Sequence, residues 1–252
     1  MTKVAIAFEA GNYRFVRAVM QYSAGVVAQS GFVVQRARFA RSLPLADGFA
    51  AIEAFLDARG RPLTAFCACE LRSPEPFTEQ GFAAFNREYV KTLEQWNIYR
   101  DGVNPVARTN VCPLLDPPSS PSLYAFSYTV PSTSHDRATF VVAGSGETRE
   151  GGASYRENIV ALGDISLAGL RAKVRHVVEQ MDRRMSLLGV THGDITTTNA
   201  YTVHDIGPLV RTEILERKLA RDGLVLHACR PPVVDLEFEM DVLGTAAETF
   251  IQ

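Results

Sequence analysis

The sequence predicts an α+β fold made of two similar units in tandem, residues 1–131 and 132–252, each a mixed β-sheet with two helices packed on one face. Three observations lead to this prediction. A β-branched strand that ends in Ser-Gly occurs twice, an amphipathic helical pattern follows each copy, and each half closes with an arginine-bearing segment and a final strand. A pattern that recurs in the same order is typical of a duplicated structural unit.

The opening strands of the two halves are residues 22–31 and 137–146. Both are rich in valine and alanine, which favours extended structure, and both end in a Ser-Gly pair. A serine directly after a strand can line a pocket, although Ser-Gly is equally a turn signal. Ser30 and Ser145 are therefore candidate substrate-binding residues.

The first helix of each half is predicted over residues 48–59 and 167–188. In both segments apolar residues recur every three to four positions, so that one side of the helix is apolar. Gly60 and Gly189 follow as helix stops. Each helix therefore needs a sheet to lie against.

Each half continues with a second strand, a second helix and a final strand. The predicted strands are 64–71, 122–130, 195–203 and 234–243, and the predicted helices are 77–96 and 209–222. The units join near residues 131–135. Because two helices cover only one face of each sheet, the other face must be buried against another copy, and we expect a homo-oligomer.

The composition limits the function. The 252 residues are enough for a large core, and the net charge of −2 gives no basic field to hold a nucleic-acid backbone. No apolar run reaches the roughly 20 residues that span a bilayer, and no signal peptide is recognisable. We therefore expect a soluble, cytoplasmic protein without nucleic-acid or membrane partners. The five histidines and four cysteines show no metal-ligand spacing, so no metal site is expected.

Arg108 stands among small residues in the segment 104–112, after a predicted helix and before an apolar strand. A guanidinium placed there can point into a cleft and bind a carboxylate through paired hydrogen bonds. The alternative is an ordinary surface arginine. Cys112, in the same segment, is a further candidate for the cleft, with packing as a small apolar side chain as its alternative.

Several motifs, taken in order, carry a resemblance to a known family. They are Phe85-Asn86-Arg-Glu-Tyr89, Pro105-Val-Ala-Arg108-Thr109, Gly193-Asp-Ile-Thr-Thr-Thr-Asn-Ala-Tyr-Thr-Val203 and Leu236-Glu-Phe-Glu-Met-Asp-Val-Leu243. With the Ser-Gly strand ends and the helices between them, they resemble the RidA/YjgF family, once called endoribonuclease L-PSP. The resemblance covers nearly the whole chain as two degenerate copies, and it points to a tandem member similar to aminomuconate-type deaminases.

The resemblance implies chorismate-mutase-like units with ligand clefts between neighbouring units. It also implies a trimeric assembly, here a trimer of two-domain chains or, alternatively, a three-unit ring completed in some other way. The implied activity is hydrolysis of an enamine or imine to a ketone and ammonia, without metal or organic cofactor. We therefore expect a small-molecule carboxylate substrate, a 2-amino-dienoate such as 2-aminomuconate, converted to the keto or enol acid.

The resemblance also suggests site residues. The family's carboxylate-binding arginine falls on Arg108 in the first unit and, less well, on Arg230 in the second, where two prolines follow. The family's asparagine on the second helix matches Asn86, whereas the second unit has Arg211 near that place.

The family's acidic residue on the last strand, which positions water, aligns with Ser127 in the first unit and with Glu239 or Asp241 in the second. We therefore expect a composite cleft, in which Arg108 binds a carboxylate and an acid of the adjoining unit holds the attacking water. Alternation along a strand also allows these acids simply to face solvent, together with Glu237.

Two other functions remain open. One is hydrolysis of a ring carboxylate, because the chorismate-hydrolysing group resembles the same fused architecture. The other is a non-catalytic protein in which the arginines bind a carboxylate metabolite and no reaction follows.

Overall fold

The computed structural model describes residues 5–133, 136–149 and 154–252. In these ranges the strands form one mixed sheet of 12 strands, so the predicted α+β class is confirmed, with a single continuous sheet. The strands are β1 (Ile6–Phe8), β2 (Tyr13–Val16), β3 (Gly25–Ala28), β4 (Phe32–Pro44), β5 (Phe66–Arg72), β6 (Ala107–Pro113), β7 (Ser122–Pro131), β8 (Phe140–Gly146), β9 (Thr197–Thr202), β10 (Val225–Arg230), β11 (Glu239–Gly244) and β12 (Glu248–Ile251). The helices are α1 (Leu45–Asp57), α2 (Glu79–Gln95), α3 (Tyr155–Asn158), α4 (Leu167–Leu188) and α5 (Gly207–Leu209).

The same strand order occurs twice in the sheet. In the N-terminal half, β7 lies antiparallel between β4 and β5, and β6 runs parallel to β5. In the C-terminal half, β11 lies antiparallel between β8 and β9, and β10 runs parallel to β9. Helices α1 and α4 occupy equivalent places in the two orders, as do α2 and α5.

The place of β3 differs from the sequence prediction, which matched residues 22–31 with residues 137–146. In the sheet order, β8 holds the place that β4 holds in the N-terminal half, and β3 pairs with β8 itself. In that antiparallel pair Gly25 lies opposite Val142. Both segments are short, apolar and β-branched, so composition alone could not distinguish a repeated strand from a neighbouring one.

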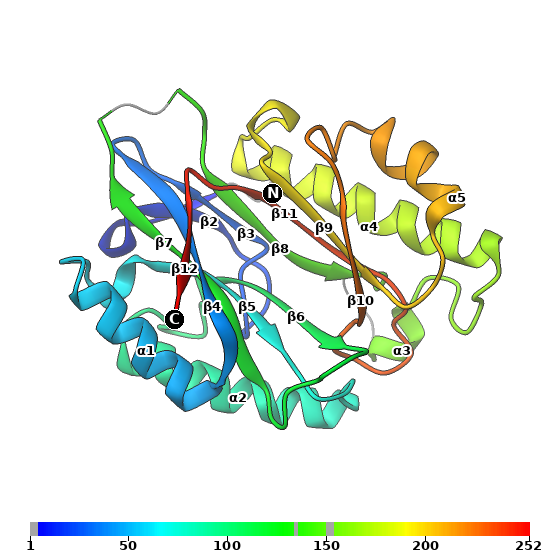
Figure 1. Cartoon of the computed structure of the whole chain (residues 1–252), viewed down its shortest axis with the longest axis horizontal. Coiled ribbons are helices and arrows are strands. Elements are labelled where there is room, and N and C mark those ends of the chain that lie inside the picture. Colours follow the sequence, from blue (N-terminus) through cyan, green and yellow to red (C-terminus); the bar gives the residue numbers. More distant parts are fainter. Residues whose placement is uncertain (1–4, 134–135, 150–153) are drawn as a thin grey trace.

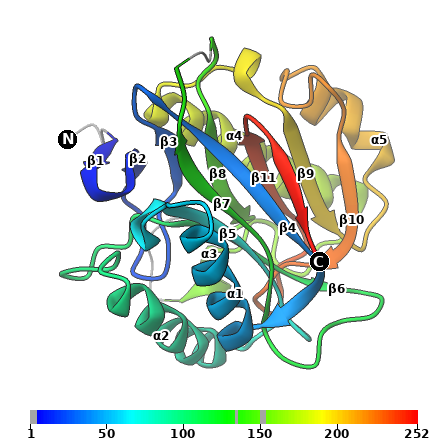
Figure 2. The same cartoon turned by 60° about the vertical axis from the view of Figure 1, so that its left-hand side comes forward.

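The two halves face each other across the middle of the molecule. In Figures 1 and 2 the strands lie between α1 and α2 on one side and α4 and α5 on the other. The edge-to-edge pairing of β6 with β10 comprises two residue pairs. The halves also pair edge to edge through β3 with β8 and through β12 with β4. Face to face, they bury an apolar layer that includes Tyr13, Val34, Cys67 and Val141. The second face of each half-sheet is therefore covered within the chain.

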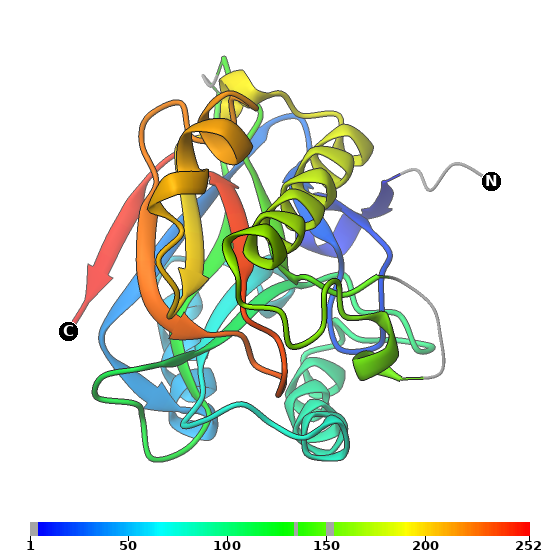
Figure 3. The same cartoon turned by 90° about the vertical axis from the view of Figure 1, so that its right-hand side faces the viewer.

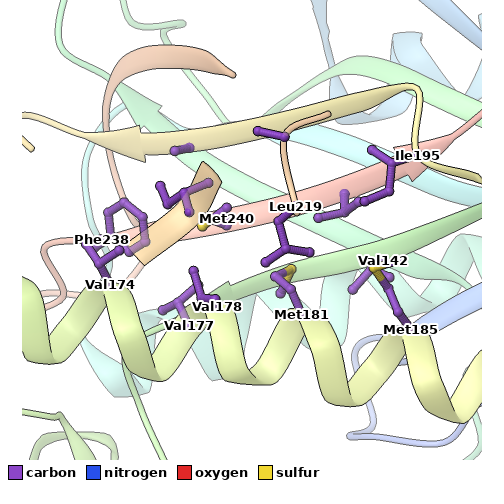
Figure 4. Packing of buried hydrophobic residues seen from close by; sticks show 14 of the residues in the cluster. Val142, Val174, Val177, Val178, Met181, Met185, Ile195, Leu219, Phe238 and Met240 are labelled. Atoms are coloured by element: carbon purple, nitrogen blue, oxygen red, sulfur yellow. The ribbon is translucent and has the colours of Figure 1, made fainter. Parts of the chain in front are cut away.

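Helix α4 has the predicted bounds because its sequence carries signals at both ends. The Ser166 hydroxyl accepts a hydrogen bond from the Gly169 backbone N–H, which satisfies a donor of the first turn. Gly189 closes the helix with φ of 76°, in the left-handed region that glycine adopts without strain. The apolar side of the helix packs on β8 and β11 (Figure 4), through Val174, Val177, Val178, Met181 and Met185.

Two elements are shorter than predicted. The helix expected over residues 209–222 consists of α5 and a π-helical turn, Val210–Leu215. The last strand of the repeat, expected over residues 234–243, begins only at Glu239. Asp235 has φ of 72°, and a residue in the left-handed region interrupts an extended chain.

The proposed boundary between the units falls between β7 and β8. Residues 134 and 135 of the expected junction lie outside the described residues, and the division into 1–131 and 132–252 stays a prediction. In the described ranges no helix combines the length and hydropathy needed to cross a membrane.

Replacing Met181 by alanine should lower the free energy of unfolding by about 2–5 kcal/mol, because the side chain is fully buried between α4 and the sheet and the variant leaves a cavity. Urea denaturation followed by circular dichroism measures the change. Leu167→Ala, at the exposed start of the same helix, is the control and should change the free energy by less than about 0.5 kcal/mol. Equal effects of the two substitutions would contradict this packing of α4.

Candidate active site

A cavity of about 440 Å³ lies where the two halves meet at the side of α2 and α3. Figure 3 shows α3 close to α2, and the Tyr155 backbone N–H donates to Glu79 Oε1 at 3.3 Å. The N-terminal half supplies residues of β6 and α2 to the cavity wall, and the C-terminal half supplies residues of β8, α3, α4 and β11. Among the lining residues are Arg108, Asn110, Gly144, Ser145, Arg184 and Glu239. Side chains of both halves thus line one cavity, as a composite cleft requires.

Arg108 lies on β6 and is 3% exposed. Its Nη2 donates to Asn86 Oδ1 of α2 at 2.7 Å, so Asn86 orients the guanidinium without itself lining the cavity. The guanidinium carbon also lies 4.7 Å from the ring centre of Tyr89, a distance typical of a cation–π contact. Among the described residues Nη1 has no hydrogen-bond partner. A buried hydrogen-bond donor without a partner destabilises the folded protein, so Nη1 is suited to donate to an acceptor atom of a ligand.

Asn110 lies two residues further along β6, and residues two apart on a strand share one face. Its Oδ1 accepts a hydrogen bond from Ser73 Oγ at 2.9 Å, which fixes the orientation of the amide. Its Nδ2 is buried and has no hydrogen-bond partner among the described residues. Arg108 and Asn110 therefore offer two oriented donors to one ligand, an arrangement that suits a carboxylate.

Glu239, the first residue of β11, reaches the same cavity from the other half and is 4% exposed. Burial raises the pKa of its carboxyl well above the usual range, and the nearby Asp241 and Glu147 raise this pKa further. Arg184 and Arg108 oppose the shift. The carboxyl group can therefore hold its proton toward neutral pH and act as an acid inside the cavity.

Gly144 of β8 makes room for this carboxyl group. A Cβ atom at position 144 would lie 2.1 Å from Glu239 Oε1, far inside van der Waals contact. The backbone of Gly144 is fixed at both ends of its peptide, since its N–H donates to Thr109 Oγ1 and its carbonyl accepts from Arg184 Nη1, at 3.1 and 3.2 Å. A glycine is needed here for space, since the chain and the carboxyl group approach so closely.

Asp241, the other candidate acid, lies behind the cavity wall. It is 1% exposed, and its carboxyl accepts hydrogen bonds from Thr109, Asn199 and Tyr201 at 2.7–3.0 Å. Burial raises the pKa of Asp241 to about 6, and the charge of Glu70 contributes to the same shift. The side chain ties β6 to β9 and β11, and it does not line the cavity.

Of the other predicted site residues, one lines the cavity and the rest lie away from it. Ser145 lines the cavity, whereas Ser30 lies in an exposed turn before β4. Ser127 is buried on β7, away from the cavity lining. Cys112 is buried on β6, and burial raises the pKa of its thiol to about 12. Arg230 has a half-exposed side chain whose Nη1 donates to Glu237 Oε2 at 3.1 Å.

Sequence reasoning missed several residues of the cavity wall. Asn110 stands inside the segment already centred on Arg108, and its two-residue spacing on a strand could have identified it. Arg184 lies on α4 among other charged residues, and a charged residue beside the apolar positions of a helix is normally expected on its polar face. Tyr155 lies on the short helix α3, which was not predicted.

Among the described residues, no group of three or more histidine, cysteine, aspartate or glutamate side chains is placed to hold a metal ion. The guanidinium, amide and carboxyl groups that line the cavity can together bind an organic anion and transfer a proton to it.

Replacing Gly144 by alanine should force the Glu239 carboxyl group out of its place, because backbone hydrogen bonds hold the glycine and the new methyl group would overlap Oε1. We expect a loss of about 1–3 kcal/mol in the free energy of unfolding and a rotated Glu239 in a crystal structure of the variant. Gly193→Ala is the control, since a Cβ atom there has its nearest neighbour at 3.4 Å. A variant with Glu239 in its original rotamer and with parental stability would refute this packing.

This chain is similar to several known proteins. The 2-amino-5-chloromuconate deaminase of Comamonas testosteroni is 54% identical to this chain over 248 residues, which are 98% of this chain and 99% of that protein. Among solved structures, a chorismatase has a TM-score of 0.44 and 11% identity, over 88% of this chain and 77% of that one. A cyanuric acid hydrolase from A. caulinodans has a TM-score of 0.40 and 14% identity, over 88% and 68% of the two chains. A family model described as 2-aminomuconate deaminase CnbZ matches residues 5–249, and the chain therefore belongs to the 2-aminomuconate deaminase CnbZ family.

Proposed function

We propose that the cavity is the active site of this protein, which is an aminomuconate deaminase, a hydrolase that acts on C–N bonds. The observation that carries the proposal is the meeting of two kinds of group in one buried place. Two donors of Arg108 and Asn110 lack partners among the described residues, and Glu239, an acid with a raised pKa, lines the same cavity. An amino-dienoate presents the matching groups, a carboxylate beside a carbon that carries nitrogen.

The repeated strand order supports a finer description of the fold. In this description the chain consists of two tandem RidA-like, chorismate-mutase-like units, residues 1–131 and 132–252, and the active site is composite. The first unit contributes the carboxylate-binding arginine, and the second contributes the acid. The recurrence of one strand order with equivalent helices supports the duplication.

In the first step, Arg108 and Asn110 bind the carboxylate next to the amino-bearing carbon. The guanidinium is already oriented by Asn86, so little conformational freedom is lost on binding. Glu239 then donates its proton to the carbon end of the enamine. The C=C bond becomes a C–C bond, the C–N bond becomes C=N, and Glu239 becomes a carboxylate.

In the second step, the Glu239 carboxylate accepts a proton from water as the water oxygen bonds to the C=N carbon. The product is a carbinolamine, and Glu239 is again protonated. Glu239 next protonates the amino group, the C–N bond breaks, and ammonia leaves. The hydroxyl proton returns to Glu239 as the ketone forms, so one water is consumed and one ammonia is released. These steps require no metal or organic cofactor.

Family membership favours the deaminase over the two alternatives, a hydrolase of a ring carboxylate and a non-catalytic binder. The remaining predicted site residues have no step in this mechanism, and their direct participation stays an untested prediction; they are Arg230, Ser30, Ser145, Ser127, Cys112 and Asp241.

The homo-oligomer, a trimer of two-domain chains, also stays a prediction. An uncovered sheet face does not support the oligomer, because the facing halves already bury each other's inner sheet faces. Exposed apolar side chains on β10 and on the edge strand β12, namely Val225, Leu226 and Phe250, now give the support.

Arg108→Ala should lower kcat/KM for 2-aminomuconate roughly ten- to a hundredfold, because one charge-assisted hydrogen bond to a carboxylate contributes about 1.5–3 kcal/mol. Ammonia release measures the reaction. Arg230→Ala is the matched control, since Arg230 pairs with Glu237 away from the cavity, and it should retain parental turnover. If folded Arg108→Ala turned over the substrate as fast as the parent protein, the carboxylate site would have to be placed elsewhere.

Glu239→Gln should lower kcat by roughly 10² to 10⁴-fold, the usual contribution of general acid–base catalysis. The protonated carboxyl starts the reaction, so parental kcat/KM should be constant below the raised pKa of Glu239 and fall as pH rises through it. The variant should lack this alkaline decline. Glu237→Gln is the control, because that side chain pairs with His204 and Arg230 instead. Parental rates in Glu239→Gln across the pH range would disprove the assignment.

A further inference from the structure

We infer that Glu147, held by Lys173, is a positioning residue that fixes the acid Glu239 in the active site. The inference rests on the catalytic role proposed above for Glu239. Glu147 directly follows β8, and Lys173 lies on α4. Neither residue lines the cavity, and the mechanism above gives neither a step.

The pair is completely buried. Both side chains are 0% exposed, and Lys173 Nζ lies 3.3 Å from Glu147 Oε1. Lys173 Nζ also donates to the Val160 carbonyl oxygen at 2.9 Å. Removing two charges from water costs several kcal/mol for each ion, and a well-packed apolar pair is often at least as stable. Stability alone is therefore a weak reason for this pair, and a specific structural task is the better explanation.

The carboxylate of Glu147 holds the chain just before the catalytic acid. Its Oε1 accepts the Glu237 backbone N–H at 2.6 Å, and its Oε2 accepts the Phe238 backbone N–H at 3.1 Å. Glu239 is the next residue. Hydrogen bonds from two successive peptide groups to one carboxylate fix the direction in which the chain enters β11. The backbone position of Glu239 thus depends directly on Glu147.

The same residue also holds the neighbouring wall of the cavity, at the end of β8, in place. Gly146 and Thr148, on either side of Glu147, line the cavity, whereas the Glu147 side chain points to the other side of the chain, toward α4. The Glu147 carbonyl oxygen accepts the Val160 backbone N–H at 2.8 Å, just beyond the lining residue Asn158. One buried pair therefore connects β8, the loop after α3, helix α4 and the start of β11.

The Glu147–Lys173 pair also affects the pKa of Glu239. The groups that act on Glu239 come from four elements, Asp241 of its own strand, Glu147 after β8, Arg184 of α4 and Arg108 of β6. The negative charge of Glu147 raises the pKa of Glu239. Removing that charge should lower this pKa and move the alkaline decline of kcat/KM to lower pH.

The test uses the full-length enzyme with 2-aminomuconate as substrate. Glu147→Gln combined with Lys173→Met removes both charges together, so that no buried charge is left alone and the fold can persist. We expect kcat to fall roughly ten- to a hundredfold with KM within about threefold, the loss expected when a catalytic group is displaced while the substrate site is intact. The alkaline decline should move to lower pH.

The variant Glu147→Asp distinguishes the effect of the Glu147 hydrogen bonds from the effect of its negative charge. The shorter side chain keeps the negative charge but loses reach to the Glu237 and Phe238 N–H groups. It should lower kcat like the double variant while leaving the alkaline decline close to its parental pH. A purely electrostatic role predicts parental kcat in Glu147→Asp, and that result would overturn the inference.

Glu213→Gln is the matched control. Glu213 is a second buried carboxylate bound to α4, through Arg171 and Arg175 at 3.1–3.2 Å, and it is remote from the start of β11. It should lower the thermal midpoint without changing kcat or the pH profile. If Glu213→Gln lowered kcat as much as the double variant for the same loss of stability, Glu147 would have only a structural role.

The two proposals fail in different ways. If Glu239→Gln keeps parental activity, the catalytic assignment of Glu239 is wrong, whatever the Glu147 variants do. If Glu239→Gln is inactive while the double variant keeps the parental kcat and pH profile, only the positioning role of Glu147 is wrong.

Discussion

The hydroxyl group of Thr109 joins the two halves of the molecule at the point on which the active-site geometry depends. It accepts the backbone N–H of Gly144 and donates to the carboxyl of Asp241, so that β6 is fixed against β8 and β11. Its two neighbours on β6, Arg108 and Asn110, then project to the opposite face of the strand and reach the cavity. A shift of this one strand would separate the arginine from the acid, because they belong to different halves.

The burial of charged groups at this junction explains much of the surrounding sequence. Arg108 needs Asn86 and an aromatic surface to remain buried, and Glu239 needs a raised pKa or a cationic neighbour. Gly144 leaves room for the carboxyl group of Glu239, and the Glu147–Lys173 pair holds the backbone just before that residue. In the proposed mechanism this burial has a use, because the raised pKa keeps Glu239 protonated so that it can donate its proton to carbon.

The sequence allowed prediction where local patterns decide the structure. The bounds of α4 follow from a regular apolar period and a glycine stop. Arg108 and Glu239, to which the family resemblance pointed, both line the cavity, and their roles stay predictions. The pairing of β3 with β8 could not be predicted, because it depends on contacts between segments more than a hundred residues apart, as for Gly25 and Val142. Lys173 on α4 and Glu147 after β8 were missed because charged side chains normally contact solvent.

The close approach of Gly144 to Glu239 has an evolutionary consequence. A side chain at position 144 and the present rotamer of Glu239 exclude each other, so position 144 is constrained for as long as the carboxyl group must stay in its place. A descendant that lost the acid would be free to acquire a small residue opposite it. A side chain at position 144 therefore serves as a marker of a displaced or lost acid when distant homologues are aligned.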